Sequence, residues 1–152
     1  MWAELQLQAS LPTARLVGLE RWENRLQFRD YFTTSKNLQV KRKDDGGANE
    51  QWMWHGTSKF DPKGILRHEA GMDPRFSSEG FYGTGLYLAE KARYSGGIGS
   101  RYAYCPHYPD TSVRQLVLAR AAVGKARDYG TTVDRDLRKP PNAWSSSGQR
   151  LG

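Results

Sequence analysis

Turn-forming segments interrupt this chain so often that its helices and strands must be short. The 152 residues include 16 glycines and seven prolines, and four stretches rich in glycine, proline or charged residues lie at 41–49, 73–85, 95–100 and 105–110. Glycine and proline mark turns because glycine adopts backbone angles that other residues avoid, whereas proline fixes φ and lacks the N–H that regular elements need. Several small elements connected by loops are therefore expected.

The segments between these loops carry both helical and strand patterns. Leu16, Leu19, Trp22 and Leu26 recur at helical spacing and predict an amphipathic helix over about residues 15–35. Residues 61–71 predict a short helix, with Asp61 as its N-cap and proline at the first helical position. The aromatic run that starts at residue 51 predicts a strand that Gly56 ends, and the apolar run at 113–123 predicts another strand. Residues 86–95 predict a strand that leads into a short helix.

This mixture of elements indicates an α+β fold. Strands and helices do not alternate regularly, as they do in a doubly wound parallel sheet. The nearest approach to a dinucleotide-binding glycine motif is residues 83–90, GTGLYLAE, which lacks the third glycine. A Rossmann domain is therefore disfavoured.

Composition limits the class of protein further. Cys105 is the single cysteine, so an intrachain disulfide cannot form. Residues 1–19 lack the continuous apolar stretch of a signal peptide, and no run is apolar and long enough to span a membrane. We expect an intracellular protein, cytoplasmic or nuclear. The formal net charge of +7 favours an anionic partner such as a nucleic acid or a phosphorylated cofactor, although a solvated basic face would give the same total.

Four ordered stretches resemble one family. They are NEQWMWHGTS at 49–58, the glycine-rich stretch at 71–95 that contains GTGLYLAE, RQLVLARAAVGKARDYG at 114–130, and the pair Pro140-Pro141. Together they resemble the catalytic domain of the poly(ADP-ribose) polymerases, and most closely its mono-ADP-ribosylating branch. The resemblance runs from about Arg15 to Pro141.

The resemblance implies a fold and a domain plan. The expected fold has the split antiparallel β-sheets of ADP-ribosyltransferases with short flanking helices. Residues 1–152 would form a single partial domain, with a leading helix at 15–35, an NAD-binding core at 49–141 and an irregular tail at 142–152. In the family a third catalytic residue, glutamate in polymerising members, lies on a later strand. The sequence reaches Gly152 before such a strand, so we expect the C-terminal part of the domain to be missing.

The resemblance also implies the site residues. His55 and Tyr87 would be catalytic, with His55 binding a ribose hydroxyl and Tyr87 lining one face of the nicotinamide. Gly56 and Ser95 would hold the nicotinamide amide, and Tyr102 would stack on its other face, with Tyr104 as the rival for that role. The full set expected to bind NAD is His55, Gly56, Thr57, Arg75, Tyr87, Ala89, Ser95 and Tyr102.

No metal is expected in this chain. Cys105 and His107 resemble the start of a zinc site found in some relatives, but two ligands do not complete a tetrahedral site.

Three functions are compatible with these observations. The first is transfer of ADP-ribose from NAD to a protein, or to a nucleic acid, with release of nicotinamide. The second is a module that binds NAD or ADP-ribose without turnover. The third is a basic nucleic-acid-binding domain, although the sequence contains none of the common RNA-binding motifs. The acceptor and the oligomeric state are left open by the sequence.

Overall fold

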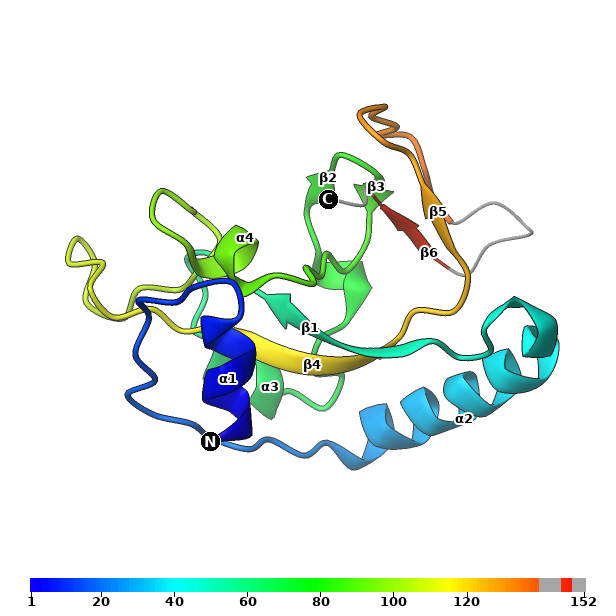
Figure 1. Ribbon diagram of the computed structural model, residues 1–152, viewed down its shortest axis with the longest axis horizontal. Helices are drawn as coiled ribbons and strands as arrows, with labels where there is room; N and C mark the ends of the chain where they lie inside the picture. Colours follow the sequence, from blue (N-terminus) through cyan, green and yellow to red (C-terminus); the bar gives the residue numbers. More distant parts are fainter. Residues whose placement is uncertain (140–145, 149–152) are drawn as a thin grey trace. The chain divides into compact units, whose positions relative to one another are not determined.

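The computed structural model describes residues 1–139 and 146–148. The Pro140-Pro141 pair that contributed to the family resemblance lies outside the described residues, as does the predicted tail apart from 146–148. In chain order the elements are α1 (Trp2–Gln8), α2 (Arg25–Lys41), the 3-10 turn η1 (Lys43–Asp45), β1 (Glu50–His55), α3 (Pro62–Arg67), the 3-10 turn η2 (Pro74–Phe76), β2 (Glu79–Gly80), β3 (Gly83–Thr84), α4 (Ala92–Gly96), β4 (Val117–Ala122), β5 (Ala126–Asp128) and β6 (Ser146–Gly148) (Figure 1).

The strands pair in small sheets, which confirms the α+β class. Strand β1 pairs with β4, β2 pairs with β3 in antiparallel register, and β5 pairs with β6 (Figure 1). The β5–β6 pair is parallel, unlike the antiparallel sheets that we expected. The long connection from Asp128 to Ser146 permits this direction, because only a tight hairpin turn enforces antiparallel pairing. Strand β6 also corrects the expectation of a wholly irregular tail.

The chain divides into two compact units. Unit 1 comprises residues 1–24, 52–71 and 88–119, and unit 2 comprises 25–51, 72–87 and 120–152. Strands β1 and β4 each contribute residues to both units.

Helix α3 forms where its capping signals predict. The Asp61 carboxylate accepts a hydrogen bond from the backbone N–H of Lys63 at 2.8 Å, and Pro62 occupies the first helical position. These residues satisfy or remove backbone donors that the first helical turn would otherwise leave unpaired. The helix ends at Arg67, four residues before Gly71, the last residue of the predicted range.

The predicted helix over residues 15–35 is wrong in its first half. Helix α2 begins only at Arg25, and contacts within unit 1 hold the preceding residues against α3. The Glu20 carboxylate pairs with the Lys63 ammonium at 2.5 Å, and the Arg67 guanidinium lies 5.6 Å from the centre of the Trp22 ring. The Asn24 amide donates to the Glu69 carbonyl at 2.8 Å. These tertiary contacts outweigh the weak local preference for a helix.

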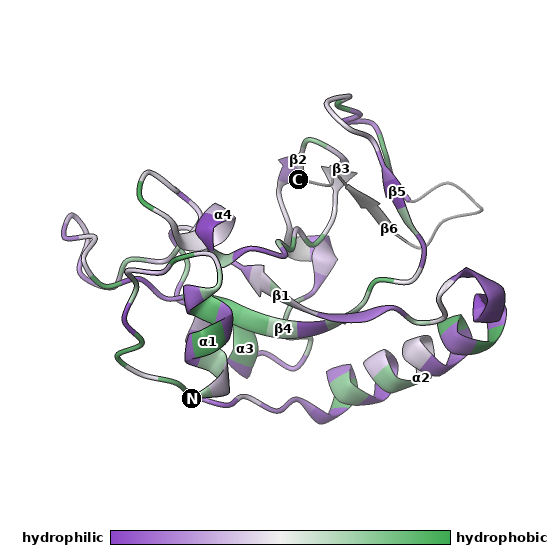
Figure 2. Ribbon diagram, in the orientation of Figure 1, coloured by the Kyte–Doolittle hydropathy of each residue, from purple (hydrophilic) through white to green (hydrophobic). Residues whose placement is uncertain are grey.

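Burial in the described residues is slight. The buried apolar residues are four alanines and one tryptophan: Ala3, Ala48, Trp54, Ala92 and Ala103. No large side chain of the described residues is fully buried. Helix α2 contains no buried residue, and Figure 2 shows hydrophobic and hydrophilic bands alternating along it. No helix in the described part of the chain is long and apolar enough to cross a membrane.

Candidate active site

The end of strand β1 forms the centre of the candidate site in unit 1. His55 is the last residue of the strand and Gly56 follows it directly. Gly56 has no space for a side chain: a Cβ there would lie 2.2 Å from the backbone oxygen of Tyr102. The backbone N–H of Ser58 donates to that same oxygen at 2.7 Å. The histidine-glycine turn is therefore packed directly against the backbone of residue 102.

This contact gives a structural reason for a glycine at position 56. The resemblance implies that the missing side chain lets the nicotinamide ring approach, and this stays a prediction. In the structure the missing side chain lets the backbone of Tyr102 approach.

Ala89 and Ser95 both contact Trp54, the residue before His55. Ala89 exchanges two backbone hydrogen bonds with Trp54, at 2.7 and 2.8 Å. Ser95 is buried near the end of α4, and its hydroxyl lies 3.5 Å from the Trp54 carbonyl oxygen. Only this single bridge at Ala89 forms where we expected a longer strand over residues 86–89. Both residues therefore contact Trp54, the residue directly before His55.

The structure distinguishes Tyr102 from its rival Tyr104. Tyr102 contacts the histidine-glycine turn through its backbone, whereas Tyr104 pairs with Gln115 in an isolated β-bridge. The Tyr102 ring is 39% exposed and stacks on the ring of Tyr94, with centroids 5.4 Å apart. Tyr102 is therefore the residue of the two that lies beside His55 and Gly56.

Thr57 has a structural contact of its own. Its hydroxyl donates to the carbonyl of Phe60 at 2.5 Å, and the residue is 7% exposed. This bond closes the turn that follows the strand. While this bond holds, the Thr57 hydroxyl can contact a ribose hydroxyl only as an acceptor.

Tyr87 belongs to unit 2, where the β2–β3 turn holds its side chain. The Tyr87 hydroxyl donates to the carbonyl of Gly83 at 2.7 Å and accepts from the backbone N–H of Tyr82 at 2.8 Å. A Cβ at Gly80 would lie 2.4 Å from the phenol ring, so the ring packs on that glycine. Burial raises the pKa of Tyr87 and so favours its neutral phenol.

Arg75, also in unit 2, is paired with a neighbouring acid. Its guanidinium binds the Asp73 carboxylate through Nε at 2.8 Å and Nη2 at 2.5 Å. The side chain of Asp73 is only 9% exposed, whereas that of Arg75 is 80% exposed. The hydrogen bond to Asp73 raises the pKa of Arg75, which keeps its charge permanent. An exposed, oriented guanidinium of this kind can bind a phosphate group.

The predicted site residues thus fall into two groups. Unit 1 brings together His55, Gly56, Thr57, Ala89, Ser95 and Tyr102. Unit 2 holds Arg75 and Tyr87. Sequence reasoning missed Tyr94 and Ser100, which contact Tyr102, and Asp73, which orients Arg75.

Comparison with known proteins identifies the family. Residues 6–149 match the family described as the poly(ADP-ribose) polymerase catalytic domain. The chain belongs to the poly(ADP-ribose) polymerase family. A protein of Dictyostelium discoideum described as a probable poly [ADP-ribose] polymerase is 31% identical over 112 residues. That match covers 73% of this chain but only 32% of the relative, so the chain spans about a third of the relative's length.

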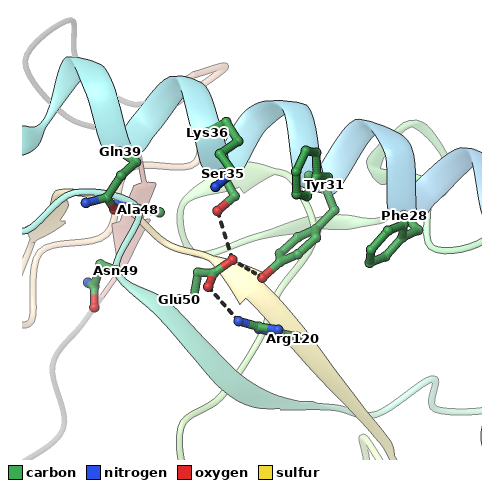
Figure 3. A pocket seen from close by; sticks show the side chains of 10 residues that line it. Phe28, Tyr31, Ser35, Lys36, Gln39, Ala48, Asn49, Glu50 and Arg120 are labelled. Carbon is green, nitrogen blue, oxygen red and sulfur yellow. Dashed lines mark hydrogen bonds and ion pairs between the residues drawn. The ribbon is translucent and has the colours of Figure 1, made fainter.

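This polymerase-family chain also has a pocket in unit 2 that the sequence did not indicate. It has a volume of about 470 Å³ and lies between α2, the start of β1 and Arg120 of β4 (Figure 3). Glu50 lies at its centre: one carboxylate oxygen accepts from the Tyr31 hydroxyl and, at 2.8 Å, from Ser35, and the other pairs with Arg120 at 2.6 Å (Figure 3). These donors, Tyr31 first, lower the pKa of Glu50.

The Glu50 contacts connect α2 to both strands within this unit. Burial, followed by the hydrogen bond to Glu50, raises the pKa of Tyr31 to about 12. No sequence pattern reveals these contacts, because Tyr31, Glu50 and Arg120 are far apart along the chain.

The described residues contain no group of three or more His, Cys, Asp or Glu side chains that could hold a metal ion. Cys105 is a partly buried free thiol.

Proposed function

We propose that this chain is the NAD-binding part of an ADP-ribosyltransferase that transfers ADP-ribose from NAD to a protein side chain. Membership of the poly(ADP-ribose) polymerase family supports the reaction class. The observation that carries the proposal is the contact of the His55-Gly56 turn with Tyr102 in unit 1, beside the contact of Ser95 with Trp54, the residue before His55. These contacts gather one imidazole, one hydroxyl and one exposed aromatic ring around a single strand end.

The reaction breaks the bond between the nicotinamide nitrogen and the ribose carbon. Nicotinamide leaves as a neutral molecule, a nucleophilic atom of the acceptor forms the new bond to that carbon, and the acceptor loses a proton. The transition state resembles an oxocarbenium ion, so an enzyme accelerates the step mainly by holding the ribose and the leaving group in position.

Each residue has a part that suits its chemistry. His55 would hydrogen-bond a ribose hydroxyl and so fix the sugar. Ser95 would rotate from its long contact with Trp54, at 3.5 Å, to donate to the nicotinamide amide. The exposed ring of Tyr102 would stack on the flat nicotinamide, since aromatic rings favour offset stacking. From the family resemblance, Tyr87 would line a face of the nicotinamide and Arg75 would contact the adenosine half of NAD.

The deciding experiment measures nicotinamide release from NAD by the wild type, His55→Ala and His107→Ala. His107 is an exposed histidine outside the candidate site, so its replacement is the matched control. We expect release by the wild type and by His107→Ala, and its loss in His55→Ala. Equal release by all three would refute the assignment of His55.

Binding is measured separately from turnover. Saturating NAD should raise the melting temperature of the wild type, because a ligand that binds only the folded state stabilises it. Tyr87→Ala and Ser95→Ala should each reduce that rise. A shift in melting temperature without nicotinamide release would support the alternative of an NAD-binding module without turnover.

A further inference from the structure

We propose that Tyr94 and Ser100 are positioning residues that hold the ring of Tyr102 for stacking on nicotinamide. The inference rests on the proposed function and extends it to residues that do not themselves touch the substrate. It concerns residues 94–102, all of which lie within unit 1.

The Tyr94 ring lies flat against the ring of Tyr102. Their centroids are 5.4 Å apart and their planes differ by 17°. Tyr94 is 46% exposed and Tyr102 is 39% exposed, so the pair lies at the surface. With Tyr94 against one face of the Tyr102 ring, the opposite face is the one that a nicotinamide would use. Stacked aromatic pairs are favourable beyond their burial, so Tyr94 restricts the orientation of Tyr102.

Ser100 fixes the backbone on both sides of this ring pair. Its hydroxyl lies 3.0 Å from the carbonyl oxygens of Tyr94 and Ser95, and the single hydroxyl proton is shared between these two acceptors. The same oxygen accepts from the backbone N–H of Tyr102 at 3.3 Å. The Ser100 hydroxyl therefore connects Tyr94, Ser95 and Tyr102 through hydrogen bonds.

The glycine-rich loop between Ser95 and Tyr102 is closely packed. A Cβ at Gly96 would lie 2.6 Å from the Leu116 side chain, and one at Gly97 would lie 2.5 Å from the backbone oxygen of Arg93. Gly99 has a φ of +82°, which side chains other than hydrogen rarely permit. The Arg114 guanidinium donates to the carbonyls of Gly96 and Gly97. The glycines thus allow a compact loop, and the hydrogen bonds from Arg114 hold it in place. This loop sets the distance from Ser95 to Tyr102.

The test compares Tyr94→Ala, Tyr94→Phe and Ser100→Ala with the wild type in nicotinamide binding and in the kinetics of NAD turnover. Tyr108→Ala is the matched control, because Tyr108 is 81% exposed and makes no ring contact with Tyr102. We expect Tyr94→Ala to weaken nicotinamide binding by about 3- to 10-fold, the range of one aromatic pair. Because Tyr94 does not touch the reacting atoms, KM for NAD should rise while kcat changes by less than about twofold.

Two variants distinguish a positioning role for the Tyr102 ring from a general loss of structure. Tyr94→Phe keeps the stacked ring and should restore wild-type affinity. Ser100→Ala keeps both rings but removes the hydroxyl, and should weaken binding in the same direction as Tyr94→Ala. Ser100→Ala also provides the test if Tyr94→Ala does not fold.

Three results would overturn the inference. Unchanged nicotinamide affinity in Tyr94→Ala and Ser100→Ala would mean that Tyr102 needs no support. Tighter binding in Tyr94→Ala would mean that Tyr94 competes with nicotinamide for the ring. A wild type that binds neither nicotinamide nor NAD would instead refute the proposed function, and the inference with it.

Discussion

Gly56 illustrates how closely the candidate site is packed at the level of single atoms. The position has no room for even one methyl group, because the obstructing atoms belong to the backbone of Tyr102 and cannot rotate away. Gly56 also follows the proposed catalytic histidine directly. A change there should therefore affect stability and NAD binding together.

We expect Gly56→Ala to lower the free energy of unfolding by about 1–3 kcal/mol, the usual cost of overpacking. The same variant should lose the stabilisation by NAD. Gly64→Ala is the matched control, because nothing lies within 4 Å of a Cβ at this exposed position in α3. Replacing glycine by alanine inside a helix should be neutral or stabilising, by roughly 0.5–1 kcal/mol. Chemical denaturation of both variants measures the difference, and equal stabilities would contradict the packing that we describe.

Tyr102 and Tyr87 show two ways of fixing an aromatic side chain. Tyr102 is held through its backbone and by the ring of Tyr94, whereas the hydroxyl of Tyr87 is held by the backbone of the β2–β3 turn. In both cases the ring remains 39% exposed. An exposed ring with restricted motion loses little entropy when a flat ligand stacks on it.

Among the elements, α2 depends on polar contacts for its attachment to β1 and β4 in unit 2. None of its 17 residues is buried, yet Tyr31 and Ser35 both donate to Glu50. Arg120 pairs with the same carboxylate, and its guanidinium lies 5.9 Å from the centre of the Tyr31 ring. The stability of this attachment should consequently depend on pH.

Tyr31→Phe tests that dependence at alkaline pH. Because the pKa of Tyr31 is raised to about 12, the folded state favours the neutral phenol. The contribution of Tyr31 to the stability of the folded state is fully present below the ordinary tyrosine pKa of about 10 and is lost as the pH rises through 12. The melting temperature of the wild type should therefore exceed that of Tyr31→Phe by a constant amount up to about pH 10, and the excess should decrease above it. Circular dichroism from pH 8 to 12 measures this, and a constant difference throughout would refute the contact.

The start of α2 is set by contacts with residues that are distant in the chain. The helical pattern of residues 15–35 continues through Trp22, but the ion pair of Glu20 with Lys63 and the bonds of Asn24 hold that segment outside the helix. The helix then begins immediately after Asn24. Local periodicity could not predict this boundary, because the competing partners lie more than 40 residues away.

For the whole molecule, the main feature is the large number of exposed apolar side chains. Phe28 and Phe32 of α2 stack on each other while 66% and 51% exposed, and Val40 of the same helix is 79% exposed. An amphipathic helix usually gains most of its stability by burying such a face. Side chains exposed in this way favour association between molecules.

We expect the isolated chain to associate through α2 as its concentration rises. Phe28→Lys combined with Phe32→Lys should reduce this association, and it should lower the melting temperature by only a few degrees, because neither ring is buried. Phe60→Lys, at an exposed phenylalanine outside α2, is the control. Light scattering over a concentration series measures the effect. Association that the double variant leaves unchanged would place the contact elsewhere.

The sequence by itself determined the α+β class, the family, the cap of α3 and the strand that ends at His55. Each of these depends on residues that are neighbours in the chain: a proline beside an aspartate, a run of aromatic residues, or motifs in a fixed order. The family match over residues 6–149 agrees with that order.

Only the tertiary structure decided the boundary of α2, the direction of the β5–β6 pair, the choice of Tyr102 over Tyr104 as the neighbour of His55 and Gly56, and the contacts of Tyr94, Ser100 and Glu50. These features depend on groups that folding brings together from distant positions. The energies of these tertiary contacts are comparable to those of local conformational propensities. No local pattern could therefore have predicted which of the two would determine the structure.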